Sequence, residues 1–490
     1  MADALRILFA VSEVAPFSKT GGLGDVASAL PRALSALGHD VRVVTPRYRA
    51  FAGAVERLAV MRVSTPQGMV SATVGRAVLP DSAVPVYTVE DDRGWFDRDG
   101  LYQSHSGDFP DNLERFAFFS RAALQVPSVV GWTPHVIHCH DWQTALIPLY
   151  VAAGSERPAV RTVLTIHNMG FHGSFPGDRF PAIGIPAAWF SINGVEFFNC
   201  VNLLKGGLLA ADLITTVSPT YAEEIQTEPL SHGLHGVLAT RRRDLVGILN
   251  GIDRKAWNPA TDSLLAARFS ASKPAGKAAC REDLLRRVNL TAGPAPVLAL
   301  VTRLAEQKGV DLVIDLLPDL LLLDLRLVVL GTGDGPYETA LRHWAAKRPD
   351  RVAAVLAFDE SMAHRIMAGA DVFLMPSRYE PCGLSQMYAM RYGAVPVAHQ
   401  TGGLADTIVD YTPRTVHDGR ATGFLFRPCA ADNLLRAIQF ALAVRRDRAA
   451  WKRLVVNAMR ADFGWEQSAT QYVDAYRRAL MKQPRRPLAE

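Results

Sequence analysis

From residue 5 the chain reads Leu5-Arg6-Ile7-Leu8-Phe9-Ala10-Val11, and from residue 18 it reads Ser18-Lys19-Thr20-Gly21-Gly22-Leu23-Gly24-Asp25. The first stretch is an aliphatic run of strand length, and the second is a glycine-rich turn before a helical pattern that ends at Gly38. Because glycines allow close backbone approach and a helix N-terminus favours an anion, this unit predicts a ligand-binding turn. A tight turn with a solvated Lys19 is the alternative. The spacing does not fit the dinucleotide motif G-x-G-x-x-G.

The alternation of short apolar runs with helical patterns continues along the chain, which is typical of doubly wound parallel sheets. We expect further strands near 41–44, 136–139 and 162–166, and then a second sheet from 245–249 through 296–301, 325–330, 352–356 and 372–375. The chain has 490 residues, too many for one ordinary core, so two α/β domains are expected. An echo between Gly21–Val26 and Gly402–Thr407 is consistent with two related halves, although one such match is weak.

Composition excludes several classes of protein. The net charge of +5 is small for this length, and the basic residues form no long run that would indicate nucleic-acid binding. The five cysteines are far apart without a C-x-x-C pair, which argues against a disulfide framework and a structural zinc site. The N-terminus leads directly into a strand pattern, and the most apolar stretch, Leu312–Leu330, contains several charges. We therefore expect a soluble, cytoplasmic protein that binds neither membrane nor nucleic acid.

Polar residues that follow the strands are the candidates for a site, because open α/β sheets bind ligands beyond the carboxyl ends of their strands. His138-Cys139-His140-Asp141-Trp142 follows one strand, and we expect its two imidazoles to point to opposite faces and to be poor joint metal ligands. Asp141 is suited to holding sugar hydroxyls. Thr165–Gly170 places His167 and Asn168 at another strand end, where a lone histidine is more often structural than catalytic.

In the second half, Arg303 and Lys308 follow a strand and form a pair suited to a diphosphate. A buried strand is expected to end at Met375, just before Pro376–Gln386. A helix is expected to begin near Gly383, and its first N–H groups would face a phosphate. Glu380 would stand near a sugar, or would only cap the helix. No convincing metal site emerges, so Arg303, Lys308 and the helix dipole would stabilise a leaving diphosphate without a metal.

Together these stretches resemble the bacterial glycogen synthase and plant starch synthase family, the ADP-glucose-dependent retaining glycosyltransferases of the GT-B type. The likeness runs almost end to end. It rests on Lys19–Val26, Tyr102, Gly107-Asp108, Asp111-Asn112, Arg115-Phe116, His140-Asp141-Trp142, His167-Asn168, Ser218–Ala222, Asn250–Asp253, Arg303, Gln307–Gly309 and Arg378–Leu384.

The resemblance implies an α/β fold with two doubly wound Rossmann-like domains facing a central cleft. Residues 1–244 would form the N-terminal, acceptor-side domain, and residues 245–463 the nucleotide-sugar domain. Residues 464–490 would form a helix that crosses back to the first domain. The implied activity is transfer of glucose from ADP-glucose to the non-reducing end of an α-1,4-glucan, such as glycogen, with retention and without a metal cofactor. The domains would close over the donor.

The resemblance also implies roles for single residues. Glu380 would hold glucosyl hydroxyls and stabilise charge at the anomeric carbon, His167 would line the reacting face with its main-chain carbonyl near that carbon, and Arg303 and Lys308 would bind the ADP phosphates. The remaining substrate-binding residues would be Lys19, Gly21, Gly22, Asp25, Asp141, Asn168, Asn250, Phe358, Cys382, Gly383, Leu384 and Ser385. Among these, Lys19 and the Gly21-Gly22 backbone would contact the donor, Asp25 would support their loop, and Asp141 and Asn168 would orient sugars.

The chain departs from the family's pattern at four positions. Phe358 stands for the tyrosine that stacks on adenine, His172 for a glutamine, His235 for an acid and Ser385 for a threonine. Two alternatives remain open from the sequence. One is a retaining transferase that uses UDP-glucose or another acceptor, and the other is a catalytically silent glucan-binding protein with the same fold.

Overall fold

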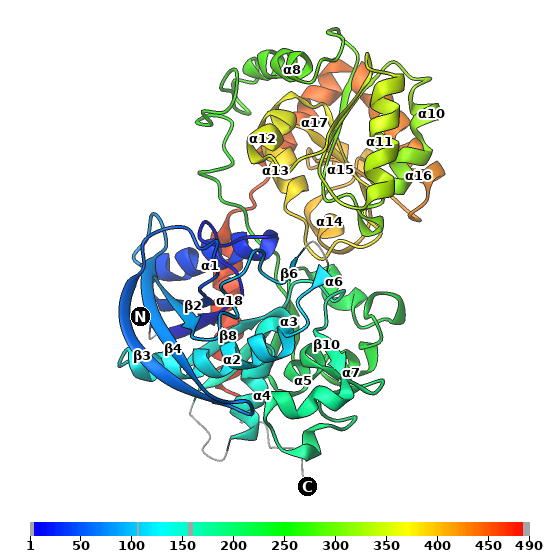
Figure 1. Ribbon diagram of the computed structural model, residues 1–490. Coiled ribbons are helices and arrows are strands. Elements are labelled where there is room, and N and C mark those ends of the chain that lie inside the picture. The colour runs from blue at the N-terminus through cyan, green and yellow to red at the C-terminus, as the bar shows by residue number, and fades with distance from the viewer. Residues whose placement is uncertain (1–3, 105–106, 155–159, 484–490) are drawn as a thin grey trace. The chain divides into compact units, whose positions relative to one another are not determined.

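The computed structural model describes residues 4–104, 107–154 and 160–483. The chain forms two compact units (Figure 1). Unit 1 comprises Met1–Gly251 and Trp465–Glu490, and unit 2 comprises Ile252–Gly464. In the described ranges, no helix is both long and apolar enough to cross a membrane.

Unit 1 is built on a large, mostly parallel sheet, to which nine strands belong within the described residues. Their order is β14-β13-β9-β8-β1-β2-β5-β4-β3, and only β4 runs antiparallel to its neighbours β5 and β3. The strands are β1 (Arg6–Ala10), β2 (Asp40–Pro46), β3 (Glu56–Thr65), β4 (Gly68–Val78), β5 (Pro85–Asp91), β8 (Val136–His140), β9 (Arg161–Ile166), β13 (Leu213–Thr216) and β14 (Leu245–Gly247). Small antiparallel ribbons are formed by β6 (Gln103–Ser104) with β7 (Gly107–Asp108), and by β10 (Ser174–Pro176), β11 (Glu196–Phe197) and β12 (Cys200–Asn202).

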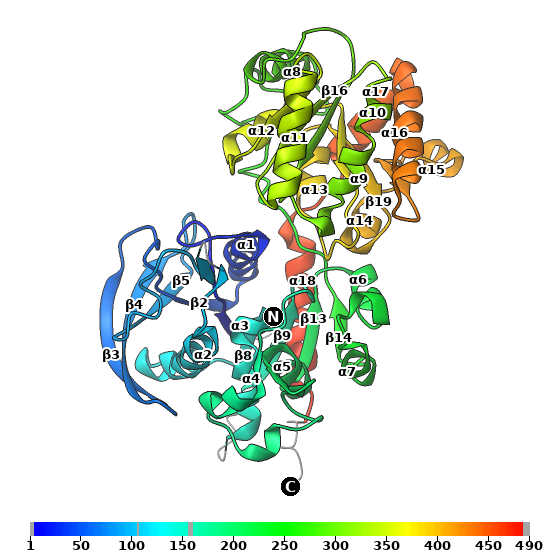
Figure 2. The same cartoon turned by 45° about the vertical axis from the view of Figure 1, so that its right-hand side comes forward.

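The helices of unit 1 alternate with these strands along the chain. They are α1 (Gly22–Ala36), α2 (Asn112–Val129), α3 (Asp141–Thr144), α4 (Leu146–Ala153), α5 (Leu203–Ala210), α6 (Pro219–Glu224), α7 (His235–Thr240) and α18 (Trp465–Leu480), with short 3₁₀ turns at Gly177–Ile183, Ala187–Trp189 and Glu228–Leu230. Val26, Leu30 and Leu34 of α1 share one core with Tyr472 and Tyr476 of α18. Figures 1 and 2 show α18, in red, beside this sheet. The last helix is therefore part of unit 1, while residues 484–490 of the expected segment lie outside the described residues.

One strand lies in a different sheet from the one expected. Leu245–Leu249 was expected to open the second sheet, but β14 pairs in parallel with β13 at the edge of the sheet of unit 1. The physical reason is that an apolar run specifies a strand and not its partner, and β13 offers the unpaired edge beside it.

Unit 2 contains a parallel sheet with the order β17-β16-β15-β18-β19-β20 in the described part of the chain. Its strands are β15 (Val297–Val301), β16 (Arg326–Leu330), β17 (Val352–Val355), β18 (Val372–Met375), β19 (Val395–His399) and β20 (Phe424–Phe426). Its helices are α8 (Gly276–Arg287), α9 (Val310–Asp315), α10 (Leu317–Leu320), α11 (Gly335–Lys347), α12 (Glu360–Gly369), α13 (Ser385–Arg391), α14 (Gly402–Thr407), α15 (Pro413–His417), α16 (Ala431–Arg446) and α17 (Arg448–Arg460), with a 3₁₀ turn at Glu306–Lys308. Figure 2 shows helices over both faces of this sheet, which makes it doubly wound as expected.

The sequence echo does not mark equivalent places in the two units. Gly21–Val26 begins α1 after β1, which lies in the middle of its sheet, whereas Gly402–Thr407 forms α14 after β19, next to the edge strand β20. The strand of unit 2 that corresponds to β1 in chain order and central position is β15. The echo is therefore no support for related halves.

Candidate functional site

In unit 2 the strand order reverses between β15 and β18, and such switch points are where open α/β sheets bind ligands. The loops after these two strands are tied together. The backbone N–H of Arg378 donates to the carbonyl of Gln307 (2.9 Å), and the Arg378 guanidinium binds both carboxylate oxygens of Asp311 (2.8 and 2.6 Å). Gly309 has a φ of +65°, and a Cβ there would overlap the carbonyl oxygen of Pro376. The loops after β15 and β18 are therefore held against each other.

An ion pair lies where these loops meet. Lys308 Nζ donates to Glu380 Oε2 (2.7 Å), and Ser377 Oγ donates to the same oxygen (2.9 Å). The Glu380 residue is only 5% exposed, and its backbone carbonyl accepts from Gly403 N–H (3.0 Å). A nearly buried carboxylate needs such partners, because removing a charge from water costs several kcal/mol. The arrangement sets a cation suited to phosphate beside a carboxylate suited to hydroxyl groups.

Other predicted residues of unit 2 surround this pair less closely. Arg303 follows β15 with an exposed side chain, whose Nη2 donates to Gln307 Oε1 (3.3 Å). Cys382 is buried, and Gly383 takes a φ of +70° just before Leu384 and Ser385 lead into α13. Helix α13 thus begins two residues later than expected.

Phe358 lies at a different part of the same sheet. It follows β17, the edge strand, and β16 separates that strand from β15. The residue is 83% exposed, so its aromatic face is open to a ligand. Within unit 2 the structure therefore brings together Lys308 and Glu380, and it leaves Phe358 two strands away.

Unit 1 has its own switch point, with β1 between β8 and β2. After β1, Lys19 Nζ and Asp25 Oδ1 form an ion pair (2.7 Å) across the glycine-rich loop, and α1 begins at Gly22 with Gly21 as its N-cap. The carboxylate of Glu13 lies under this loop. It accepts from Thr20 N–H and Thr20 Oγ (both 2.7 Å) and from Gly24 N–H (3.1 Å). Glu13 is 2% exposed, and burial raises the pKa of its carboxyl group.

Glu13 was not singled out from the sequence. The signal that could have found it is the one used elsewhere, since Glu13 is a charged side chain that directly follows a buried strand. Ser12, its neighbour, shares a hydrogen bond with the hydroxyl of Tyr102 (2.7 Å), a residue that the resemblance does include.

Asp141 and His167 come together at the ends of β8 and β9. Asp141 has a φ of +54°, which is rare for a residue with a side chain, and its Oδ1 accepts from the backbone N–H of His167 (2.7 Å). Asn168 Oδ1 accepts from Gly170 N–H (2.8 Å). Burial raises the pKa of Asp141 to about 7 and lowers that of His167 to about 3. His167 is therefore a neutral imidazole near pH 7.

The expectation that His138 and His140 point to opposite faces is wrong. Residues i and i+2 of a strand share a face, and the two ring centroids lie 4.1 Å apart. Both residues are fully buried, and His138 bonds the hydroxyls of Tyr476 (2.8 Å) and Thr165 (2.6 Å). No group of three or more His, Cys, Asp or Glu residues is placed to hold a metal ion in the described part of the chain.

Asn250 lies one residue before Gly251, where the first segment of unit 1 ends. It is 6% exposed, and its Oδ1 has no hydrogen-bond partner among the described residues. A buried amide oxygen of this kind is available to a ligand or to water.

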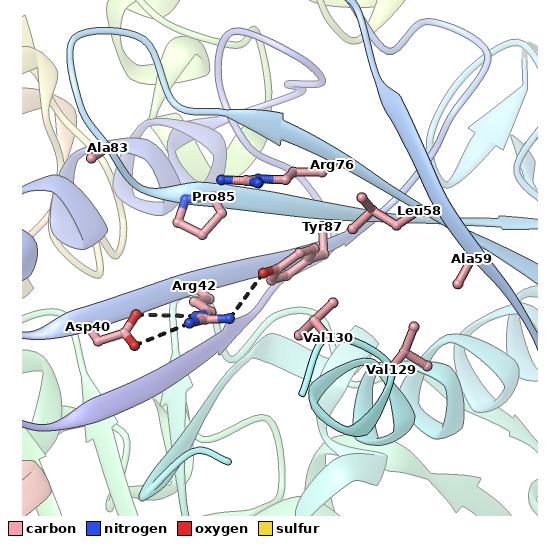
Figure 3. Close-up of a pocket in the computed structure, with 10 residues that line it drawn as sticks. All are labelled: Asp40, Arg42, Leu58, Ala59, Arg76, Ala83, Pro85, Tyr87, Val129 and Val130. Carbon is pink, nitrogen blue, oxygen red and sulfur yellow. Dashed lines mark hydrogen bonds and ion pairs between the residues drawn. The ribbon is translucent and has the colours of Figure 1, made fainter. Parts of the chain in front are cut away.

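A groove of about 630 Å³ lies elsewhere on unit 1, at the sheet face beside the end of α2 (Figure 3). Its lining residues include Arg42, Arg76 and Tyr87, and none of the residues predicted from the sequence. Arg42 already binds Asp40 and the hydroxyl of Tyr87 (Figure 3). This groove is thus distinct from the two switch points.

The chain is similar to known proteins over almost its whole length. Residues 6–240 match the family model described as "Starch synthase catalytic domain", and residues 282–454 match "Glycosyl transferases group 1". The chain is 49% identical to a glycogen synthase of Anaeromyxobacter sp. (strain Fw109-5) over 96% of this chain and 99% of that protein. It is 46% identical to glycogen synthase 2 of Geobacter sulfurreducens over 97% and 99% of the two chains.

The chain is also similar to solved structures. The catalytic domain of starch synthase IV from Arabidopsis thaliana, bound to ADP and acarbose, matches with a TM-score of 0.90 and 33% identity over 98% of this chain and 100% of that one. A sucrose-phosphate synthase from Thermosynechococcus elongatus matches with a TM-score of 0.59 and 19% identity over 96% of this chain and 98% of that one, which supports the fold alone. The expected α/β fold of GT-B type, with two Rossmann-like domains, is confirmed. The chain belongs to the glycogen and starch synthase family of glucosyltransferases.

Proposed function

We propose that this chain is a glycogen synthase that transfers glucose from ADP-glucose to the non-reducing end of an α-1,4-glucan, with retention of configuration. The observation that carries the proposal is the Lys308–Glu380 pair at the switch point of unit 2. A nucleoside diphosphate sugar offers an anion to the lysine and hydroxyl groups to the carboxylate. The Arabidopsis starch synthase, whose structure holds ADP and acarbose, supports ligands of these two classes.

In unit 2, Lys308 and Arg303 would neutralise the charge that builds up on the leaving diphosphate. One preorganised donor of this kind is worth roughly 10²–10³ in turnover. The backbone N–H groups of Gly383, Leu384 and Ser385 would add to the binding of phosphate, and Phe358 would offer its exposed ring to adenine. Glu380 would hold the glucosyl hydroxyls and stabilise positive charge at the anomeric carbon.

In unit 1, Lys19 and the backbone of Gly21 and Gly22 would bind the donor, with Asp25 holding the lysine in place. His167 would line the reacting face. Asp141, Asn168 and Asn250 would orient sugars. A variant of any of these residues should therefore lower transfer.

We also propose that the reaction needs no metal ion and that the enzyme acts in the cytoplasm. Two cations and the N–H groups before α13 supply positive charge that a metal ion supplies in other transferases.

The test is transfer of radiolabelled glucose to glycogen, with ADP-glucose and UDP-glucose as separate donors. We expect incorporation from ADP-glucose that is unchanged by EDTA. A strong preference for UDP-glucose would refute the donor, and a loss of activity in EDTA that Mg²⁺ restores would refute the metal-free reaction. Glycogen that is bound but never elongated would instead identify a silent binding protein.

A further inference from the structure

We propose that His140 fixes the tautomer of His167, so that His167 presents its Nδ1–H as a hydrogen-bond donor to the substrate. The identity of that substrate rests on the proposed function, but the tautomer does not. His140 would be a positioning residue, because it acts through His167.

The geometry of the two rings carries the first step. His140 is the last residue of β8, and His167 follows β9, the neighbouring strand. His140 Nδ1 and His167 Nε2 lie 2.9 Å apart, so one of these nitrogens donates a proton to the other. His140 is fully buried, whereas His167 is partly exposed.

Both rings are neutral near pH 7, because burial lowers the pKa of each. A neutral imidazole has one N–H and one bare nitrogen. Only two arrangements are then possible. Either His140 Nδ1–H donates to His167 Nε2, or His167 Nε2–H donates to His140 Nδ1.

The other nitrogen of His140 decides between them. His140 Nε2 is buried and has no hydrogen-bond partner among the described residues. In the first arrangement Nε2 is a bare acceptor, whereas in the second it is an N–H group. A buried N–H without a partner is rarer in proteins than an unused acceptor, so the first arrangement is favoured.

The surroundings of the His140 ring support this choice. The ring of Phe9 lies against it with centroids 4.0 Å apart, and the ring of His138 lies 4.1 Å away. The two nitrogens of His138 are already used by Tyr476 and Thr165. Neither neighbour therefore offers an acceptor nitrogen to an Nε2–H of His140.

The consequence concerns what His167 can recognise. With its Nε2 accepting from His140, the proton of His167 lies on Nδ1. The ring is then a hydrogen-bond donor, suited to an oxygen acceptor such as a sugar hydroxyl or a phosphate. The reverse tautomer would offer an acceptor instead. Asp141 holds the backbone of His167 and His140 sets its ring, so two consecutive residues position it.

Nitrogen NMR tests the tautomer directly. In deuterated full-length protein with ¹⁵N-labelled histidine, long-range ¹H–¹⁵N spectra distinguish a protonated nitrogen from a bare one, and His140→Phe and His167→Phe spectra assign the signals. We expect the proton on Nδ1 in both His140 and His167. A proton on Nε2 of His167 would overturn the proposal, and this result does not depend on whether ADP-glucose is the donor.

Two variants test the consequence for turnover. His140→Phe keeps the packing but removes the donor, and we expect kcat to fall roughly tenfold, the effect of one hydrogen bond. His140→Asn places an amide N–H where Nδ1 was, and we expect kcat within about threefold of wild type. His39→Phe, which replaces another buried histidine of unit 1, is the packing control. Equal losses in His140→Phe and His140→Asn, or an equal loss in His39→Phe, would overturn the proposal.

Discussion

Two buried glutamates occupy similar places in the two units and have different partners. Glu13 follows β1 at the switch point of unit 1, and Glu380 follows β18 at the switch point of unit 2. They are 2% and 5% exposed. The hydrogen bonds of the Glu13 carboxylate come from Thr20 and Gly24 in its own loop, whereas Glu380 is bound by Ser377 and by Lys308 from a loop 72 positions away.

The difference indicates that Glu13 has a structural role, whereas Glu380 is placed to contact a ligand. Glu13 accepts from neutral donors close in the chain, so its bonds give the glycine-rich loop its shape and keep Lys19 above it. Glu380 forms an ion pair with a cation in the loop that follows another strand. In the proposed function a phosphate would compete for that cation, and Glu380 would then face the sugar of the donor. The same residue type thus supports a loop in one unit and would meet a substrate in the other.

The largest effect should come from Glu380→Gln. This change keeps the shape but removes the charge that would stabilise the anomeric carbon, and we expect turnover to fall by roughly 10³. Radiolabelled transfer measures it, with thermal unfolding to show that the fold is intact. Glu306→Gln, at an exposed carboxylate near Lys308, is the matched control and should stay within about twofold of wild type. Near wild-type turnover of Glu380→Gln would remove Glu380 from its proposed role.

Lys308→Met would make Glu380 a buried carboxylate without a cation. Breaking a buried ion pair leaves an uncompensated charge, and we expect a loss of about 3 kcal/mol in the free energy of unfolding at pH 7. Urea denaturation measures the change. Lys308→Met with Glu380→Gln should recover most of it, because no charge is left buried. If the double variant is no more stable than the single one, the pair does not carry this coupling.

Glu13→Gln should have a smaller effect on transfer, because Glu13 acts through its loop. The glutamine loses one acceptor oxygen and sets an amide N–H against the N–H groups of Thr20 or Gly24. Because the loop loses one to two hydrogen bonds, we expect kcat/KM for ADP-glucose to fall about tenfold. We also expect trypsin to cleave faster after Lys19. Glu56→Gln on the exposed edge strand β3 is the control. An effect as large as that of Glu380→Gln would contradict the distinction between the two glutamates.

The last prediction concerns pH and Asp141. Because its pKa in the folded protein is about 7, well above its ordinary value of 3.8, the unfolded chain loses this proton first as pH rises. The group therefore lowers stability progressively between about pH 4 and pH 7, and the loss is constant above that range. Asp141→Asn lacks this dependence. The urea midpoint of the variant should therefore rise relative to that of wild type as the pH increases from 4.5 to 7.5. A constant difference would show that the carboxyl group does not titrate in this range.

Much of the fold was predictable because strands and turns have local signals. The aliphatic runs 5–11, 136–139, 162–166 and 372–375 form the strands β1, β8, β9 and β18. The hairpin strands β3 and β4 with β5 were not expected, since β3 alternates between exposed and buried residues and carries charges, such as Arg57 and Arg62, on its open side. Edge strands of this kind read as polar segments.

Part of the candidate site was also predictable from the sequence. The rule that ligands lie beyond strand ends selected Lys19, Asp141, His167, Lys308 and Glu380. Each follows the carboxyl end of a parallel strand, and Asp141 begins helix α3. The rule passed over Glu13, and for His140 it predicted only a poor joint metal ligand with His138. Their importance depends on which hydrogen bonds they make, and a single sequence does not contain those partners.

The sequence by itself determined the positions of the aliphatic strands, the glycine-rich turn and the family, because each depends on residues adjacent in the chain. Only the tertiary structure decided that β14 joins the first sheet, that Lys308 meets Glu380 and that His140 meets His167. The physical reason is that these contacts join separate strands, and the order of strands in a sheet follows from long-range packing of helices over its faces.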